Sequence, residues 1–288
     1  MSFVLACPLM RLLVWCADRP GIVSAVSSFL YEAGANIVQS DQHSSDPEGG
    51  EFYLRMEFTV PNATDSLPER FAAQVADRFD MGYRFWDTRE RKRIAVLVSR
   101  YDHCLQDMLW RWKRGELEGE IVLVASNHPD LRDDVELFGI PYHHVPVEPG
   151  NKADAERKLL ELVRGQCDLV VLARYMQILS GTFLDKVGMP AINIHHSFLP
   201  AFAGAEPYRQ AHEHGVKLIG ATAHYATEQL DDGPIIQQDV IRVSHRDDVA
   251  GLERRGADIE RAVLVRAVQW HCQDRVIRHG NTTVVFGA

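Results

Sequence analysis

The sequence predicts an α/β chain of two domains, in which a ferredoxin-like α+β domain precedes a doubly wound, mostly parallel sheet. Strand-like and helix-like segments follow one another in the order βαββαβ up to about residue 87, which is the ferredoxin-like order. Beyond residue 93, near-continuous apolar runs alternate with helical patterns, as parallel strands covered on both faces require. We assign the charged stretch 88–93 to a linker, so the predicted domains are 1–87 and 94–288.

Turn residues and periodicity predict the elements of the first domain. The turn Asp18-Arg19-Pro20-Gly21 leads into a helix over Ile22–Glu32, whose apolar residues recur at helical spacing before Gly34 stops it. The other predicted elements are strands at Leu12–Cys16, Asn36–Gln42, Phe52–Val60 and Tyr83–Trp86, and a helix at Leu67–Phe79.

Alternating strands and helices are predicted for the second domain. The strands are Ile94–Val98, Ile121–Ala125, Leu169–Ala173, Ile219–Tyr225 and Ile235–Val243, and the helices are Leu105–Lys113, Asp130–Phe138 and Ala153–Val163. A sheet of this kind binds its ligands outside the carboxyl ends of its strands. We therefore expect the active site there.

The composition is that of an ordinary soluble protein, with 46% hydrophobic and 25% charged residues. A formal net charge of −9 argues against a nucleic-acid partner, which would favour a basic excess. No segment has the apolar length of a membrane span or the basic start of a signal peptide, so we expect a cytoplasmic protein. The five cysteines are dispersed without a CxxC pair, which indicates reduced thiols, and no HxxxH or Cys cluster favours a metal.

One polar segment follows a short β run at Ala191–Pro200. Asn193 and His195 are two residues apart, so on an extended strand they project to the same side. An amide and an imidazole that converge there could hold a carbonyl oxygen and stabilise the negative charge that develops on it. The pattern equally fits an Asn193 that caps a turn and a His195 whose hydrogen bonds are satisfied in the core.

A second polar segment interrupts the β runs at Glu228–Ile236. Its Leu-Asp-Asp-Gly-Pro sequence contains Asp231 and is ordinarily just a turn. Taken together, Asn193, His195 and Asp231 form a plausible set for acyl transfer: a polarising amide, an acid or oxyanion stabiliser, and a carboxylate that orients the imidazole and water.

These motifs resemble those of the formyltransferase-fold family of folate enzymes. Asn193-Ile194-His195, Ser197-Phe198-Leu199-Pro200 and Leu230-Asp231-Asp232-Gly233-Pro234 carry the resemblance, and Gly220-Ala221-Thr222-Ala223-His224-Tyr225 makes it closest to the formyltetrahydrofolate deformylases. The likeness runs from about Arg11 to the C-terminus, because those enzymes also begin with an ACT domain. It implies that Asn193, His195 and Asp231 are catalytic. It also implies hydrolysis of 10-formyltetrahydrofolate to tetrahydrofolate and formate for one-carbon and purine metabolism.

The resemblance also implies where the folate binds. It assigns Met176, Gln177, Ile178 and Leu179 to the pocket, and with them His224 and Gly233. Relatives often carry Arg where this chain has Gln177, and Glu206 stands where a basic or neutral residue is expected. The sequence assigns no role to either departure. The resemblance implies no metal and no cofactor.

The first domain resembles the ACT module at Asp18-Arg19-Pro20-Gly21-Ile22-Val23 and Gly34-Ala35-Asn36-Ile37. The resemblance implies an amino-acid effector at Asp18, Pro20, Gly21 and Asn36. A purely structural dimerisation domain is the alternative. Either role predicts a homodimer or a homotetramer.

Water is the acceptor that the sequence favours. The glycinamide ribonucleotide enzymes of the family cradle a phosphate with a glycine-rich loop, whereas Ser99–Leu105 has no glycine and places Asp102 either in the cleft or at the helix start. The transfer RNA enzymes carry a further basic domain, whereas this chain is acidic and ends at Ala288. Two alternatives stay open: a transferase with an unphosphorylated amine acceptor, and an amino-acid sensor with an inactive second domain.

Overall fold

The computed structural model describes residues 7–46, 48–61, 66–201 and 206–287, and the chain divides into two compact units. Unit 1 comprises Met1–Arg91, Asp274–Ile277 and Val284–Ala288, and unit 2 comprises Lys92–Gln273 and Arg278–Thr283. The sequence analysis assigned all of 94–288 to the second domain. The structure differs, because two C-terminal segments fold with the first unit.

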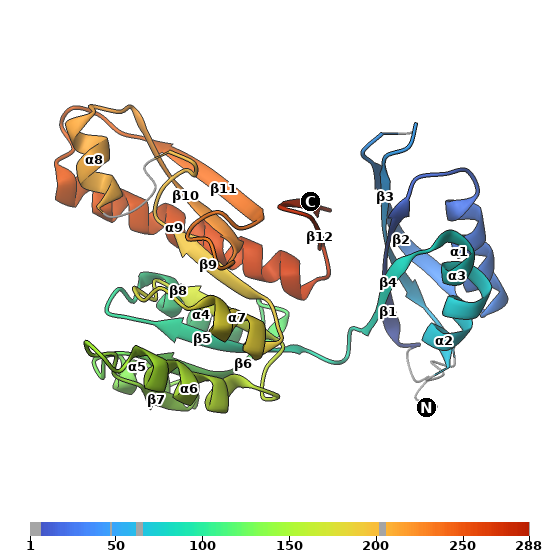
Figure 1. The fold of residues 1–288 in the computed structure, drawn as a ribbon, viewed down its shortest axis with the longest axis horizontal. Helices are drawn as coiled ribbons and strands as arrows, with labels where there is room; N and C mark the ends of the chain where they lie inside the picture. The colour runs from blue at the N-terminus through green and yellow to red at the C-terminus, as the bar shows by residue number, and fades with distance from the viewer. Residues whose placement is uncertain (1–6, 47, 62–65, 202–205, 288) are drawn as a thin grey trace. The chain divides into compact units, whose positions relative to one another are not determined.

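Unit 1 has the predicted ferredoxin-like fold, an antiparallel sheet in the order β2-β3-β1-β4 with helices packed on it (Figure 1). Its core is the cluster of apolar side chains between the sheet and those helices, among them Val26, Phe58 and Phe71. The elements are β1 Leu9–Ala17, α1 Ile22–Glu32, β2 Asn36–Ser44, β3 Glu51–Thr59, α2 Leu67–Phe71, η1 Ala72–Ala76, α3 Asp77–Phe79 and β4 Gly82–Asp87.

Buried charge holds the C-terminal segments in unit 1. Asp274 is 1% exposed, and its carboxylate lies 3.1 Å from Arg84 Nη2 and 3.7 Å from Arg11 Nη1. Arg55 is fully buried and donates from Nε to the Asp274 carbonyl oxygen at 3.0 Å. Buried charges need partners of opposite sign. Asp274 therefore fixes the start of the hairpin β12 Val276–His279 and β13 Thr282–Val285, which the sequence analysis did not predict.

Unit 2 is built on a seven-stranded sheet in the order β11-β10-β9-β8-β5-β6-β7 within the described residues. Strands β5 to β9 are parallel to one another, whereas β10 pairs antiparallel with β9 and with the edge strand β11. The strands are β5 Lys92–Val98, β6 Gly119–Ser126, β7 Tyr142–His144, β8 Leu169–Ala173, β9 Ala191–His195, β10 Leu218–Tyr225 and β11 Ile235–Arg242. The mostly parallel sheet confirms the predicted fold class.

Helices cover this sheet, and helix α9 packs against β9, β10 and β11 (Figure 1). The helices are α4 His103–Lys113, α5 Arg132–Glu136, α6 Lys152–Val163, α7 Gly181–Val187, α8 Pro207–Glu213 and α9 Val249–Cys272. Helix α9 has 24 residues and was not predicted. In the described ranges no helix combines the length and the hydropathy that crossing a membrane would require.

Residues 92 and 93, which the sequence analysis placed in the linker, are the first residues of β5. Lys92 is buried and donates from Nζ to the Cys272 carbonyl oxygen at 3.0 Å. Arg93 Nη2 lies 2.9 Å from Asp168 Oδ1. These partners within unit 2 explain why two basic residues belong to the strand and not to the linker.

Close packing at Gly256 positions the buried end of helix α8 against α9. A Cβ added at Gly256 would lie 1.8 Å from the Tyr208 hydroxyl oxygen and 2.2 Å from its Cζ. Because Gly256 has no side chain, the Tyr208 hydroxyl can pass over it and reach Glu260 Oε1, one turn further along α9, at 2.5 Å.

We predict that Gly256→Ala destabilises the protein by about 1–3 kcal/mol, since the added methyl forces Tyr208 away from α9. Gly251→Ala, in the same helix, is the control, because the atom nearest its new Cβ is a side-chain oxygen of Asp248 at 3.1 Å. Urea unfolding of both variants measures the difference. Equal stability of the two variants would show that Tyr208 packs against α9 less tightly than the geometry indicates.

Candidate active site

Strand β9 carries Asn193 and His195 at its carboxyl end, between β8 and β10. Both side chains project to the same side of the strand, as their spacing predicts. Strand β10 runs antiparallel and places His224 directly opposite Asn193. Asn193 Nδ2 lies 3.2 Å from His224 Nε2.

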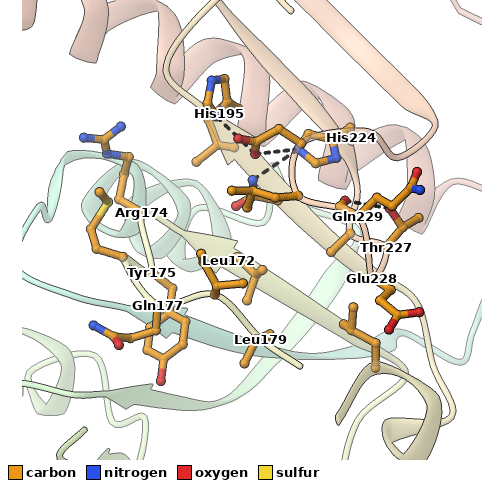
Figure 2. A pocket seen from close by; sticks show the side chains of 18 of the residues that line it. Leu172, Arg174, Tyr175, Gln177, Leu179, His195, His224, Thr227, Glu228 and Gln229 are labelled. Carbon is orange, nitrogen blue, oxygen red and sulfur yellow. Dashed lines mark hydrogen bonds and ion pairs between the residues drawn. The ribbon is translucent and has the colours of Figure 1, made fainter. Parts of the chain in front are cut away.

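The Asp231 carboxylate lies close to the imidazoles of His195 and His224, and Figure 2 shows these two rings at the same end of the cavity. Asp231 Oδ1 is 3.2 Å from His195 Nδ1 and 3.8 Å from His224 Nε2. The residue lies in the loop between β10 and β11 with φ of 56°, a left-handed conformation that Asp adopts more readily than most residues. The structure therefore brings the three predicted catalytic side chains together at the carboxyl end of β9.

Hydrogen bonds indicate the proton positions on the two histidines. His224 Nδ1 lies 3.0 Å from the Tyr225 carbonyl oxygen, so Nδ1 donates and the neutral ring accepts from Asn193 at Nε2. His195 Nδ1 faces the Asp231 carboxylate and therefore donates to it. His195 Nε2 is buried and has no hydrogen-bond partner among the described residues. This nitrogen is the free basic atom of the site.

The local environment sets the charges. Burial alone would raise the pKa of Asp231, but the hydrogen bond from His195 and the neighbouring His224 ring outweigh it and hold the pKa below its ordinary value, so the carboxylate is ionised. Burial and the nearby Arg174 cation lower the pKa of His196 to about 3, so this ring stays neutral at physiological pH. Of the two adjacent histidines, only His195 has a carboxylate partner.

A cavity of about 310 Å³ opens in front of these residues. Met176, Gln177, Ile178 and Leu179 line it as predicted, and Asn193, His195, His224 and Asp231 lie along its other side. The side chains of Met176 and Ile178 are 50% and 58% exposed, which is unusual for large apolar groups. They form an apolar wall suited to a flat ring system.

Gly233, which we predicted to bind substrate, is buried and does not line this cavity. A Cβ at this position would lie 1.8 Å from the Tyr225 carbonyl oxygen. Its glycine is explained by this close backbone approach, which shapes the loop that carries Asp231.

Several residues of the cavity were missed from the sequence. Arg174, Tyr175, His196, Thr227, Glu228 and Gln229 also line it. Arg174 offered a signal, because a charged residue immediately follows the fully apolar strand Leu169–Ala173 at its carboxyl end.

The loop after β5 supports the cavity wall. The Ser99 hydroxyl donates to Asn127 Oδ1 at 2.6 Å and accepts from the Met176 backbone N–H at 3.0 Å. Asp102 does not line this cavity; it lies at the start of α4, the second of the two positions that the sequence left open, although its side chain makes no capping hydrogen bond. It lines a different cavity, beside His103.

The two sequence departures also have defined places. Gln177 lines the cavity. Glu206 is exposed with φ of 52°, and its carboxylate lies 2.8 Å from Arg209 Nε. Glu206 is therefore part of a surface ion pair.

The residues predicted to bind an effector do not lie together in the first sheet, because Asp18 follows β1 at the end where β3 starts with Glu51, whereas Asn36 pairs with Thr59 at the other end. Asp18 follows β1 and accepts a hydrogen bond from the Ser44 hydroxyl. Pro20 is exposed, Gly21 precedes α1 with φ of 97°, and Asn36 is the exposed first residue of β2. Effector binding at these positions stays a prediction.

The tightest group of possible metal ligands among the described residues is His103, Cys104 and Glu260, whose donor atoms lie within 4.8 Å of one another. Burial raises the pKa of the Cys104 thiol well above its ordinary value. Arg174 Nε lies 3.4 Å from Glu260 Oε2. A protonated thiol and a neighbouring guanidinium both oppose a cation at this position.

Comparison with known proteins identifies the family. The formyl transferase family pattern matches residues 92–268, and the ACT domain pattern matches residues 10–73. The chain is 58% identical over 279 residues to a formyltetrahydrofolate deformylase of Mycobacterium tuberculosis, covering 96% of this chain and 90% of the relative. It is 52% identical over 280 residues to the deformylase of Bacillus subtilis, covering 96% and 93%.

Solved structures agree with these matches. A formyltetrahydrofolate deformylase from Pseudomonas syringae pv. tomato has a TM-score of 0.93 at 47% identity, covering 99% of this chain and 96% of that one. A glycinamide ribonucleotide transformylase from Symbiobacterium toebii has a TM-score of 0.65 at 32% identity, covering 70% and 97%. The fold and site are those of a formyl transferase with an ACT domain. Within that class, the chain belongs to the formyltetrahydrofolate deformylase family.

We predict that His196 makes the fold less stable as the pH falls. Its folded pKa of about 3 lies below the unfolded value of about 6.5. The unfolded chain therefore binds a proton that the folded chain excludes, and this stability is fully present above pH 6.5 and is lost as the pH falls toward 3.

Between pH 6.5 and 5, the free energy of unfolding of the wild type should fall with decreasing pH more steeply than that of His196→Gln, by up to about 1.4 kcal/mol per pH unit. Urea unfolding at pH 5, 6 and 7 measures this slope, with the exposed His245→Gln as the matched control. Parallel curves for wild type and His196→Gln would contradict the assigned pKa.

Proposed function

We propose that this chain hydrolyses 10-formyltetrahydrofolate to tetrahydrofolate and formate. Its family membership over 96% of the chain supports this function. The single structural observation that carries it is the His195–Asp231 pair, 3.2 Å apart, which lines one cavity together with Asn193.

In this proposal Asn193 polarises the formyl group. One Nδ2 hydrogen is directed at His224 Nε2, and the second is left for the formyl oxygen. Because His224 is held by the Tyr225 carbonyl oxygen, it fixes the amide before the substrate arrives. A donor fixed in advance stabilises the oxyanion of the tetrahedral intermediate more effectively than water does.

His195 acts as the general base through Nε2. The ionised Asp231 holds Nδ1 protonated and stabilises the imidazolium that forms when Nε2 takes a proton from the attacking water. The new C–O bond forms as the carbonyl π electrons move to the formyl oxygen. We infer this route through His195 because Asp231 Oδ1 already accepts from His195 Nδ1.

The second half of the reaction returns the proton. The imidazolium donates from Nε2 to the leaving nitrogen, the C–N bond breaks, and tetrahydrofolate departs as a neutral amine. Formic acid loses its proton to solvent and leaves as formate. We propose no metal and no cofactor, because the His195–Asp231 pair generates the nucleophile and Asn193 stabilises the oxyanion.

The partners follow from the same reading. We propose that the apolar wall of Met176, Ile178 and Leu179 holds the pterin ring, with Gln177 at its polar edge. We also propose a cytoplasmic homodimer or homotetramer, with an amino-acid effector bound at Asp18, Pro20 and Gly21; Asn36 lies at the other end of the sheet and is not included. Analytical ultracentrifugation with and without individual amino acids tests the assembly.

The test of function is formate release from 10-formyltetrahydrofolate by the purified chain, with no amine added. Glycinamide ribonucleotide should neither speed loss of the formyl group nor become formylated. Transfer to an added amine without formate release in its absence would identify a transferase instead. If the chain catalyses neither reaction but binds an amino acid at the effector site, this result would identify a sensor.

We predict that Asn193→Ala lowers the turnover number by about 10²–10³-fold, the usual loss for one oxyanion donor. Asn281→Ala, at an exposed position in a turn, is the matched control and should keep wild-type turnover. Steady-state formate release measures both. A loss below about threefold for Asn193→Ala would remove Asn193 from the oxyanion site.

A further inference from the structure

Arg174 is a buried cation at the carboxyl end of β8 that the mechanism above does not use. It is 7% exposed and lines the same cavity as His195 and Asp231. Its φ is 62°, a left-handed conformation that is unfavourable for a residue with a Cβ. Ser99 holds this conformation, because its backbone N–H donates to the Arg174 carbonyl oxygen at 3.3 Å and its hydroxyl accepts from Met176 N–H at 3.0 Å.

Two nitrogen atoms of the Arg174 guanidinium are not used as hydrogen-bond donors within the described residues. Nε and Nη1 are buried and make no hydrogen bond to any described residue. The group has a charge partner, since Nε lies 3.4 Å from Glu260 Oε2, and its carbon lies 4.8 Å from the centre of the Tyr101 ring. Leaving a buried charged donor unpaired is unfavourable. The unused N–H groups therefore indicate a missing acceptor.

Glu260 cannot be that acceptor, because other donors already hold it. The Tyr208 hydroxyl donates to Oε1 at 2.5 Å, and His103 Nε2 lies 2.9 Å from Oε2. Burial raises the pKa of Glu260, but the His103 hydrogen bond and the Arg174 charge outweigh it and lower the pKa to about 2. Glu260 is thus a fixed counter-charge that allows a guanidinium to stay buried here.

Arg174 lies on the reacting side of the cavity. In Figure 2 the Arg174 side chain points toward the end of the cavity where His195 lies, and away from Gln177 and Leu179. The His196 ring is adjacent, with its centroid 5.1 Å from that of His195, and burial together with the Arg174 charge lowers its pKa. An anion formed beside His195 would therefore meet the guanidinium.

We propose that Arg174 binds the formate ion as it forms and holds it until tetrahydrofolate has left. This inference rests on the proposed hydrolysis. That reaction turns a neutral formamide into a monoanion beside the ionised Asp231, which repels it. The C–O bond to the water oxygen forms, the C–N bond breaks, nitrogen gains a proton, and formic acid releases one to solvent. The formate oxygen then accepts from Arg174 Nη1 in a charge-assisted hydrogen bond.

The alternative is that Arg174 only neutralises Glu260. The two roles differ in what sodium formate does. If Arg174 binds formate, formate should contact the protein saturably and should inhibit turnover. Both effects should be lost when Nη1 is removed by mutation. A mere counter-ion gives neither, whatever its effect on folding.

The direct test is saturation-transfer NMR of sodium formate on the full-length protein with tetrahydrofolate bound. We expect transfer to the formate proton in the wild type and in the exposed control Arg100→Gln. We expect its loss in Arg174→Gln and in the double variant Arg174→Gln/Glu260→Gln, which removes both buried charges so that no carboxylate is left alone. Thermal unfolding verifies that the double variant folds. No transfer in the wild type, or transfer kept in a folded double variant, overturns the proposal.

Kinetics give a second readout. The inhibition constant of formate should rise by about 10- to 100-fold in Arg174→Lys, which keeps the charge but lacks Nη1, the range expected for a hydrogen bond to an ion. Guanidinium ion added to Arg174→Ala should restore inhibition by formate, which a merely structural role would not allow. An unchanged inhibition constant overturns the proposal, whereas absence of formate release by the wild type refutes the proposed function itself.

Discussion

Strand β9 pairs in parallel with β8 on one side and antiparallel with β10 on the other, and the site depends on this register. Asn193 lies beside Leu172 of β8 and opposite His224 of β10. The parallel pairing brings the residue after β8, Arg174, to the edge where His195 ends β9. A slip of one residue would turn the Asn193 side chain to the other face of the sheet. The chemistry of the site is thus fixed by backbone hydrogen bonds before any substrate binds.

The site contains two ionised carboxylates, each with its own set of partners. Asp231 engages His195 and His224, and Glu260 engages His103 and Arg174. His196 has no carboxylate partner of its own and stays neutral, because it is buried and near Arg174. Neighbouring histidines in sequence therefore differ: in the proposed mechanism His195 exchanges protons, whereas the His196 ring packs between those of His195 and Tyr208. The distinction comes from surroundings and not from residue type.

The sequence predicted what local patterns determine. The helix Ile22–Glu32 has its predicted bounds, because turn residues and apolar spacing define both ends. Family resemblance was needed to join Asp231 to His195, since nothing local links a turn to a strand. Asp274 folds with unit 1 through arginines distant in sequence, and the unused donors of Arg174 appear only once Glu260 is placed. Contacts between distant residues were therefore the part that periodicity could not supply.

The loop after β5 shows physically why water fits this site better than a phosphorylated amine. A phosphate would need free N–H or hydroxyl groups there. The Ser99 hydroxyl already donates to Asn127 and accepts from Met176, and its backbone N–H donates to Arg174. The polar groups of Ser99 are thus engaged by the cavity wall and by the backbone of Arg174. The cation that remains available is buried beside His195, where it can meet a small anion that arises inside the cavity but not a phosphate on an acceptor bound outside it.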